Sequence, residues 1–144
     1  MMVMAFVGGK NSMQIALLRN LEKSLKGCYR VKHIDNGNDS LPVEKKYSRL
    51  RRTCSSKHGG MVCVVTGIST QYELALLRRH QATICILNAP LHSLFHANPI
   101  IAEDLFICLR PGILDTPQKR KKYITPEEAF SICYGRYRGF LGAA

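Results

Sequence analysis

The sequence lacks the patterns that mark several common kinds of site. None of its six cysteines belongs to a CxxC pair, which argues against a zinc ribbon or a thioredoxin-like redox motif. The Walker A pattern Gly-x4-Gly-Lys-Ser/Thr is also absent. No apolar run approaches the roughly 18 residues that a membrane span needs, and no basic region precedes the apolar N-terminal stretch. We therefore expect a cytoplasmic protein with no signal peptide and no membrane partner.

Acidic residues are scarce. The 144 residues contain 10 Asp and Glu against 21 Lys and Arg, which gives a formal net charge of +11. Such an excess of positive charge attracts polyanions whatever the fold, although it is also compatible with a merely soluble basic surface. With 46% hydrophobic residues the chain is long enough for one domain with a single core and too short for two ordinary ones.

The cysteines are scattered along the chain, and we expect all of them to be reduced thiols. Cys63 and Cys85 lie inside apolar runs and are expected to be small core residues. The six positions are Cys28, Cys54, Cys63, Cys85, Cys108 and Cys133.

The most informative segment is the first one. The apolar run Val3–Val7 meets the turn Gly8-Gly9-Lys10-Asn11-Ser12, and an amphipathic helix is expected from Met13. Two glycines allow a sharp turn and close approach of a ligand, the free N–H groups of the helix point at that ligand, and Lys10 adds a positive charge. The pattern predicts a site for a phosphate-bearing ligand, with a tight turn and no ligand as the alternative.

Apolar runs and helical periodicities alternate along most of the chain. We expect strands at Val3–Val7, Tyr29–Ile34, Met61–Thr66, Thr83–Leu87 and Leu105–Leu109, the last competing with a helix from Ile101. Helices are expected after the first strand up to Gly27, from Pro42 to Cys54, after an N-cap at Ser69 or Thr70, and from a capping box at Thr125-Pro126-Glu127-Glu128 to Tyr134, with Gly135 as the stop.

This alternation predicts a three-layer α/β sandwich of the Rossmann-like kind, with four or five mostly parallel strands and helices on both faces. The core is expected at residues 1–109. Residues 110–124 contain two prolines and a run of cations and are expected to form an exposed, mobile basic loop. Residues 125–144 are expected to form a C-terminal helix and tail that pack on the core.

Two resemblances accompany these patterns. The Val-Gly-Gly turn at Val7, the His-x-Asp-x-Gly turn His33–Gly37 and the strand and Ser-capped helix within Met61–Leu87 resemble an uncharacterised family of small bacterial Rossmann-like domains. That resemblance implies the fold and no particular activity. The turn from Val7 to Ser12 resembles the Ser-Gly-Gly-x-Asp-Ser signature of the PP-loop ATP pyrophosphatases, but Val7 replaces the first Ser and Asn11 replaces the Asp.

Ligands of such sheets bind outside the carboxyl ends of the strands, where the strand order reverses. The residues expected at that rim include His33, Thr66 and Asn88, which follow or end strands. Asp35 is where Rossmann-like domains often place an acid against a ribose hydroxyl, although it is also a normal loop-capping residue. The candidates for phosphate or nucleotide binding are Gly8, Gly9, Lys10, Asn11, Ser12, Asp35, Asn36, Gly67, Ser69 and Thr70.

Two basic clusters form a second candidate site, for nucleic acid. The candidates are Lys45, Lys46, Arg49, Arg51, Arg52, Lys119, Arg120, Lys121 and Lys122. The same segments contain or adjoin Lys57, Arg136, Arg138 and the aromatic residues Tyr123, Tyr134, Tyr137 and Phe140. Cations that contact phosphates, with rings available for stacking, hold nucleic acid without reading its bases, and a solvated charged face is the alternative.

A metal site is not predicted. His92 and His96 have the spacing of two ligands on one helical face, but a third ligand would have to come from His80, Asp104 or Cys108 elsewhere in the chain. Asp35, Asp39 and His33 are acid–base candidates only because they lie in a turn. No cofactor is firmly indicated, and a nucleotide is the one candidate.

The sequence thus predicts a binding or regulatory module for a phosphate-bearing ligand, nucleic acid or a nucleotide. One alternative is an enzyme acting on a nucleotide or RNA, with Lys10, Ser12, Asp35 and Ser69 as the residues to test. The other is an adaptor for an acidic protein. An exposed strand edge at Leu105–Leu109 would allow a homodimer.

Overall fold

The computed structural model describes residues 2–37, 42–54, 60–87, 100–114 and 116–143, without the side chains of residues 43 and 139–143. Its elements follow the chain in this order: β1 (Met2–Val7), α1 (Asn11–Leu25), β2 (Arg30–Asp35), α2 (Val43–Cys54), β3 (Met61–Thr66), α3 (Gln71–Arg79), β4 (Thr83–Ile86), β5 (Leu105–Ile107), the 3-10 turn Pro111–Ile113, α4 (Pro117–Lys122), β6 (Tyr123–Ile124) and α5 (Pro126–Ala143).

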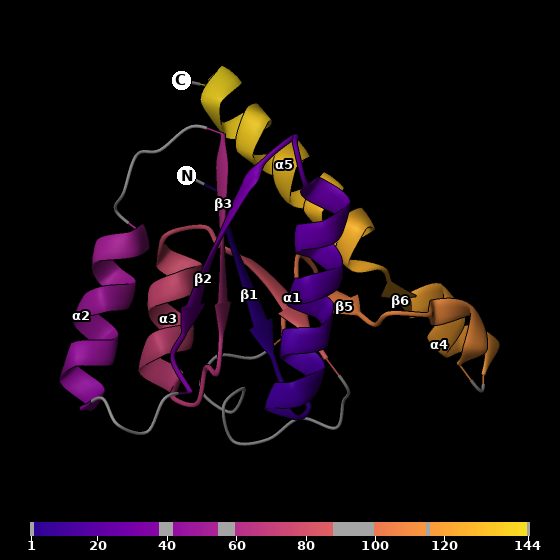
Figure 1. Ribbon diagram of the computed structural model, residues 1–144, viewed down its shortest axis with the longest axis horizontal. Coiled ribbons are helices and arrows are strands. Elements are labelled where there is room, and N and C mark those ends of the chain that lie inside the picture. The colour runs from indigo at the N-terminus through magenta and orange to yellow at the C-terminus, as the bar shows by residue number, and fades with distance from the viewer. Residues whose placement is uncertain (1, 38–41, 55–59, 88–99, 115, 144) are drawn as a thin grey trace.

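The described strands form one six-stranded sheet in the order β2-β3-β1-β4-β5-β6, and every neighbouring pair is parallel. The expected Rossmann-like α/β architecture is therefore confirmed. The order differs from the dinucleotide-binding order 3-2-1-4-5-6, because β3 lies between β1 and β2. β2 and β6 form the two edges of the sheet (Figure 1).

Both faces of the sheet are covered because β1 is buried on both sides. Its even-numbered side chains from Met2 to Phe6 pack with α1 and α5, and its odd-numbered side chains from Val3 to Val7 pack with α2 and α3. This alternation follows from the period of two in a strand. It makes β1 the centre of a three-layer sandwich, with α2 and α3 on one side and α1 and α5 on the other (Figure 1).

Local signals explain most element boundaries. Thr70 caps α3, since its hydroxyl accepts a hydrogen bond from the backbone N–H of Glu73 at 3.2 Å. The expected capping box of the last helix is confirmed: the Thr125 hydroxyl accepts from the backbone N–H of Glu128 at 3.2 Å and donates to the Glu128 carboxylate at 3.1 Å. No helix within the described residues is both long and apolar enough to cross a bilayer.

The segment 110–124 differs from the expected loop. It contains the 3-10 turn, helix α4 and strand β6. All six residues of α4 are exposed, as expected for this basic segment. Tyr123 and Ile124 pair with Phe106 and Ile107, because two apolar residues directly after the basic run can extend the sheet.

Two further expectations are wrong. Strand β5 is confirmed at Leu105–Ile107, but β6 covers its outer side, so β5 is not the exposed edge that we expected to pair two copies. The last helix does not stop at Gly135 and continues to Ala143. A helical glycine costs only about 1 kcal/mol relative to alanine, and Tyr137, one turn beyond Tyr134, still packs against the core.

Candidate functional site

The turn after β1 requires glycine for two reasons. Gly8 and Gly9 have φ angles of +88° and +65°, a conformation that other residues rarely adopt. A Cβ on Gly8 would also lie 2.5 Å from the carbonyl oxygen of Leu87, which follows β4. The backbone N–H of Leu87 in turn donates to the carbonyl of Val7 at 2.7 Å. The glycine turn is therefore packed tightly against the end of the neighbouring strand.

Gln14 fixes the orientation of this turn. Its side-chain Nε2 donates to the carbonyl oxygen of Gly8 at 2.8 Å, and its Oε1 accepts from the backbone N–H of Gly67 at 2.9 Å. In a trans peptide unit the C=O and the following N–H point in opposite directions. Because Gln14 holds the Gly8 oxygen toward the protein, the Gly9 N–H points the other way.

The start of α1 leaves further donors available. The backbone N–H groups of Met13 and Gln14 donate to the carbonyl of Lys10, which acts as the N-cap without a side-chain hydrogen bond. The amides of residues 9–12 have no hydrogen-bond partner within the described part of the chain. Gly9 through Ser12 are exposed. The structure thus places Gly8 to Ser12 together, with unpaired N–H groups at the positive end of a helix dipole.

The turns after β2 and β3 are closed by their own hydrogen bonds. Asn36 is fully buried, donates to the Glu73 carboxylate at 2.7 Å and accepts from Arg49 at 2.9 Å. Arg49 also donates to the carbonyl oxygen of Asp35 at 2.7 Å. The Thr70 hydroxyl donates to the other Glu73 oxygen at 2.8 Å. These contacts join α2 and α3 to the end of β2.

Four of the predicted ligand-binding residues therefore have structural roles. Asn36 and Thr70 belong to the network around Glu73. The Asp35 carboxylate accepts from the backbone N–H of Gly37 at 2.8 Å, so it caps its own turn, and β3 separates it from the glycine turn of β1. Gly67, with φ +73°, lies so close to the Gly37 backbone that a Cβ would collide with it. The Asp35 carboxylate therefore stabilises its own turn and does not lie next to the glycine turn of β1.

The other residues predicted at this rim include buried and exposed ones. Thr66 is buried, and its hydroxyl lies 2.8 Å from Nε2 of His33. Burial lowers the pKa of His33, more than the nearby Asp35 raises it. Ser69 is exposed in the turn between β3 and α3. Asn88 lies outside the described residues, and so do His92, His96, Asp39 and Lys57.

An apolar cavity of about 350 Å³ opens beside the glycine turn, on the side of β4 rather than β3. Four parts of the chain line it: helix α1, the residue after β4, the end of β5, and the segment from the 3-10 turn to β6. The lining residues are Met13, Ala16, Leu17, Leu87, Ile107, Cys108, Leu109, Leu114, Lys119 and Tyr123.

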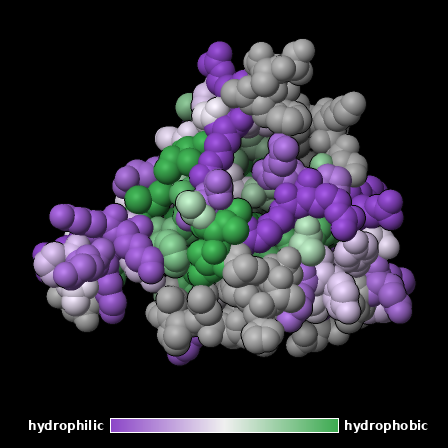
Figure 2. Space-filling view, turned by 180° about the vertical axis from the view of Figure 1, so that it is seen from behind, coloured by the Kyte–Doolittle hydropathy of each residue, from purple (hydrophilic) through white to green (hydrophobic). Residues whose placement is uncertain are grey.

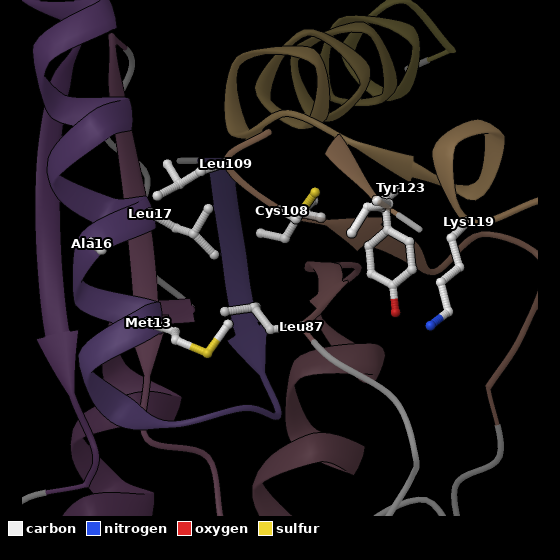
Figure 3. Close-up of a pocket in the computed structure, with 10 residues that line it drawn as sticks. Met13, Ala16, Leu17, Leu87, Cys108, Leu109, Lys119 and Tyr123 are labelled. Carbon is white, nitrogen blue, oxygen red and sulfur yellow. The ribbon is translucent and has the colours of Figure 1, made fainter. Parts of the chain in front are cut away.

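The cavity adjoins the glycine turn through Met13 and Leu87. A Cβ on Gly9 would lie 3.4 Å from the Leu87 Cβ and 3.7 Å from the Met13 sulfur. In Figure 3, Met13 and Leu87 lie at one side of the cavity, and Lys119 and Tyr123 lie at the other. The sequence contained no signal for this cavity, because its lining comes from four separate parts of the chain.

The two basic clusters do not meet. Helix α2 lies at the β2 edge of the sheet, and α4 lies beyond the β6 edge (Figure 1). Of the α2 cations, Lys45, Arg51 and Arg52 are exposed and Lys46 is half-buried, whereas Arg49 is engaged with Asp35 and Asn36. Only the α4 cluster reaches the cavity, through Lys119.

Tyr134 and Tyr137 near the C-terminus are half-buried and contact other residues of the protein. Tyr134 contacts Tyr29 and Phe130 with ring centroids 5.7 and 6.2 Å apart, and Tyr137 packs on the core. Tyr29 and Tyr134 share a hydrogen bond that raises the pKa of Tyr29 and lowers that of Tyr134. Arg138 lies 5.7 Å from the Tyr134 ring.

The described residues contain no group of three or more His, Cys, Asp or Glu side chains suited to a metal ion. Asp104, one of the three possible third ligands, is nearly buried and bound by Arg78 through two hydrogen bonds of 2.7 and 2.9 Å. All six cysteines are free thiols, as expected. Burial raises the pKa of Cys54 to about 11 and that of Cys63 to about 12, so neither thiol is suited to act as a nucleophile.

Comparison with protein-family models finds no match, and comparison with curated proteins finds none either. One solved structure, described as the crystal structure of APE1195, is similar over 68% of this chain and 69% of its own. The two chains share 16% sequence identity, and the TM-score is 0.46.

Proposed function

We propose that the protein is a binding module for a nucleotide-class ligand, whose phosphate lies at the turn from Gly8 to Ser12 and whose base lies in the adjoining cavity. The contact between turn and cavity carries this proposal. A Cβ placed on Gly9 would lie within van der Waals distance of Met13 and Leu87, which both line the cavity, so the turn adjoins the cavity wall. A ligand in the cavity would therefore have its anionic end beside the unpaired amides.

The phosphate half of the proposal rests on charge and hydrogen bonding. Backbone N–H groups at a helix N-terminus, reinforced by the helix dipole, form a favourable environment for an anion. Lys10 is exposed at the same place and adds a positive charge. The orientation that Gln14 imposes on Gly8 keeps the Gly9 N–H available.

The base half rests on the shape and chemistry of the cavity. Ligand sites are concave, mostly apolar and about 300 to 1,000 Å³ in volume, with a few polar groups that orient the ligand. The volume of about 350 Å³ is at the small end of this range and suits a single nucleotide. Lys119 and Tyr123 supply the polar groups at the far side.

Thermal unfolding in the presence of millimolar nucleoside 5′-monophosphates tests the proposal. A ligand that binds only the folded state raises the melting temperature, by several degrees when its concentration is well above Kd. The Lys10→Gln substitution should remove most of this rise. Lys23→Gln makes the same charge change at the other end of α1 and should not.

A cavity-filling variant separates the two halves of the site. Ala16 lines the cavity and is exposed on α1. Ala16→Phe should block the base and abolish stabilisation by the nucleotides, while stabilisation by inorganic pyrophosphate is retained. The proposal is wrong if no nucleotide raises the melting temperature of the wild-type protein, or if Lys10→Gln and Lys23→Gln lose the effect equally.

A further inference from the structure

Groups that can bind an anion lie at both sides of the cavity. At one side its lining residues Met13 and Leu87 adjoin the glycine turn, whose amides have no partner within the described residues, and at the other side the cavity is lined by Lys119 (Figure 3). The wall between them is formed mainly by aliphatic side chains of α1 and of the segments after β4 and β5. The site therefore offers two positions for anionic groups, separated by an apolar middle.

Positive charge continues beyond the cavity along α4. This helix has the sequence Pro-Gln-Lys-Arg-Lys-Lys, with no acidic residue and every residue exposed. Figure 2 shows α4 from behind as a hydrophilic projection beside an apolar part of the surface. The four cations are consecutive, so they spread around the helix, and one of them, Lys119, lines the cavity.

Arg120 and Lys122 on this helix are held in place by neighbouring groups. The Arg120 Nε donates to the carbonyl oxygen of Leu114 at 2.8 Å, and the Lys122 ammonium lies 4.0 Å from the centre of the Phe106 ring. Leu114 itself lines the cavity. Arg120 thus connects α4 to a residue that lines the cavity.

A free nucleoside monophosphate has one phosphate and would use only one of the two positive sides. A nucleotide inside a polynucleotide has a phosphate on both sides of its nucleoside, and further phosphates follow. Resting on the proposed function, we infer that the ligand is a single-stranded nucleic acid, with one nucleotide in the cavity, its flanking phosphates at the glycine turn and at Lys119, and the next phosphates along α4.

The strand must be single because the cavity receives an unpaired base. A base stacked and paired within a duplex is not accessible to a pocket in this way, and extracting it costs a few kcal/mol. Single strands are commonly held by a positive surface that follows the backbone together with contacts to exposed bases. The cavity and α4 supply these two parts in adjacent positions.

Fluorescence anisotropy and competition with three probes of the same base test the inference. The probes are the nucleoside 5′-monophosphate that stabilises the protein best, the corresponding 3′,5′-bisphosphate, and a labelled hexanucleotide in RNA and DNA form. We expect the bisphosphate to bind about tenfold more tightly than the monophosphate, as one additional charge-assisted phosphate contact allows, and the hexanucleotide to bind more tightly still.

Three variants test which residue is responsible for each increase in affinity. Lys119→Gln should weaken binding of the bisphosphate more than binding of the monophosphate, so that most of the difference in affinity between these two probes is lost. Lys121→Gln should weaken only the hexanucleotide and lower its salt slope by about 0.7, the value for one phosphate of a single strand. Lys45→Gln removes the same charge from the exposed surface of α2 and should have little effect.

The inference is overturned if the bisphosphate and the hexanucleotide bind no more tightly than the monophosphate, or if a duplex of the same sequence binds as well as the single strand. It is also overturned if Lys45→Gln weakens hexanucleotide binding more than Lys121→Gln does, since nucleic acid would then lie on α2. Failure of the proposed function has a different signature, in which no mononucleotide binds and Lys10→Gln changes nothing.

Discussion

The backbone N–H of Gly67 donates a hydrogen bond of 2.9 Å to the side-chain Oε1 of Gln14, 53 residues earlier in the chain. Through this contact and the bond from its Nε2 to the Gly8 carbonyl, one side-chain amide joins the turns after β1 and β3. These strands are neighbours in the sheet, but their chains continue into helices on opposite faces. Gln14 thus connects the two turns at the place where their chains leave the sheet toward opposite faces.

Replacing Gln14 by Leu should destabilise the protein. The side chain is buried, so its loss leaves the Gly67 N–H and the Gly8 C=O without their partner, at a cost of about 2 to 3 kcal/mol. Urea unfolding measures the change. The exposed Gln118 on α4 provides the matched control, and Gln118→Leu should change the free energy of unfolding by less than about 0.5 kcal/mol. Equal stability of the two variants would contradict the role assigned to the bridge.

Two glycines have the same φ angle, so substitutions at them can separate the cost of the left-handed backbone conformation from the cost of steric crowding. Gly8 and Gly27 both have φ +88°, but a Cβ on Gly27 would meet nothing within 4 Å, whereas one on Gly8 would lie 2.5 Å from the Leu87 oxygen. Gly27→Ala should cost about 1 to 2 kcal/mol, the penalty of the left-handed conformation alone. Gly8→Ala should cost clearly more.

The free energy of unfolding of both glycine variants, measured by chemical denaturation, checks this difference. If Gly8→Ala is no worse than Gly27→Ala, the turn does not pack against the end of β4 as described. The cavity wall at Leu87 would then also need to lie elsewhere.

The fold was predictable because its signals are local. The run Val3–Val7 is apolar at every position, as expected for a strand buried on both faces, and Thr125 with Glu128 shows a complete capping box. The strand order was not predictable, because nothing in the local pattern states that β3 would lie between β1 and β2. Because of that order, β3 separates Asp35 from the glycine turn after β1.

The candidate site was predictable only in part, because only part of it has a local signal in the sequence. The glycine turn is one continuous segment and could be recognised from its sequence. The cavity joins α1 to residues about a hundred positions later, and its walls exist only after folding. Gln14 did leave a signal: it precedes Leu17 and Leu18 on the buried stripe of an otherwise apolar helix face, where a polar side chain needs a partner.

The ion pair between Arg78 and Asp104 should be important for stability. Both nitrogens of the Arg78 fork contact Asp104, which also accepts from the backbone N–H of Ile101 at 3.1 Å and is nearly buried. Asp104→Asn leaves the guanidinium without its counter-charge in a poorly hydrated position. Breaking a buried pair in this way costs about 3 to 5 kcal/mol.

Glu103→Gln is the control for this substitution, since it makes the same chemical change at the neighbouring, exposed position. Its effect should be within about 0.5 kcal/mol of zero. Calorimetric melting of the two variants compares them under the same conditions. A melting temperature for Asp104→Asn as high as that of Glu103→Gln would show that the pair contributes little.

His33 should make stability depend on pH in a specific direction. Burial lowers its pKa in the folded protein below the value of about 6.5 that it has in an unfolded chain. Between these two values the unfolded chain binds more protons, so the free energy of unfolding falls as the pH decreases below about 6.5. The stability associated with neutral His33 is fully present above that pH and is lost as the pH falls through the folded pKa.

The His33→Gln variant isolates this contribution from that of the carboxylates, because glutamine does not titrate and can still form a hydrogen bond with the Thr66 hydroxyl. Unfolding free energies of both proteins are measured from pH 7.5 to pH 5. We expect the wild-type protein to lose more stability over this range than the variant does. Parallel curves would mean that His33 has the same pKa folded and unfolded, and a wild-type protein that loses less stability than the variant over this range would mean that folding favours the imidazolium.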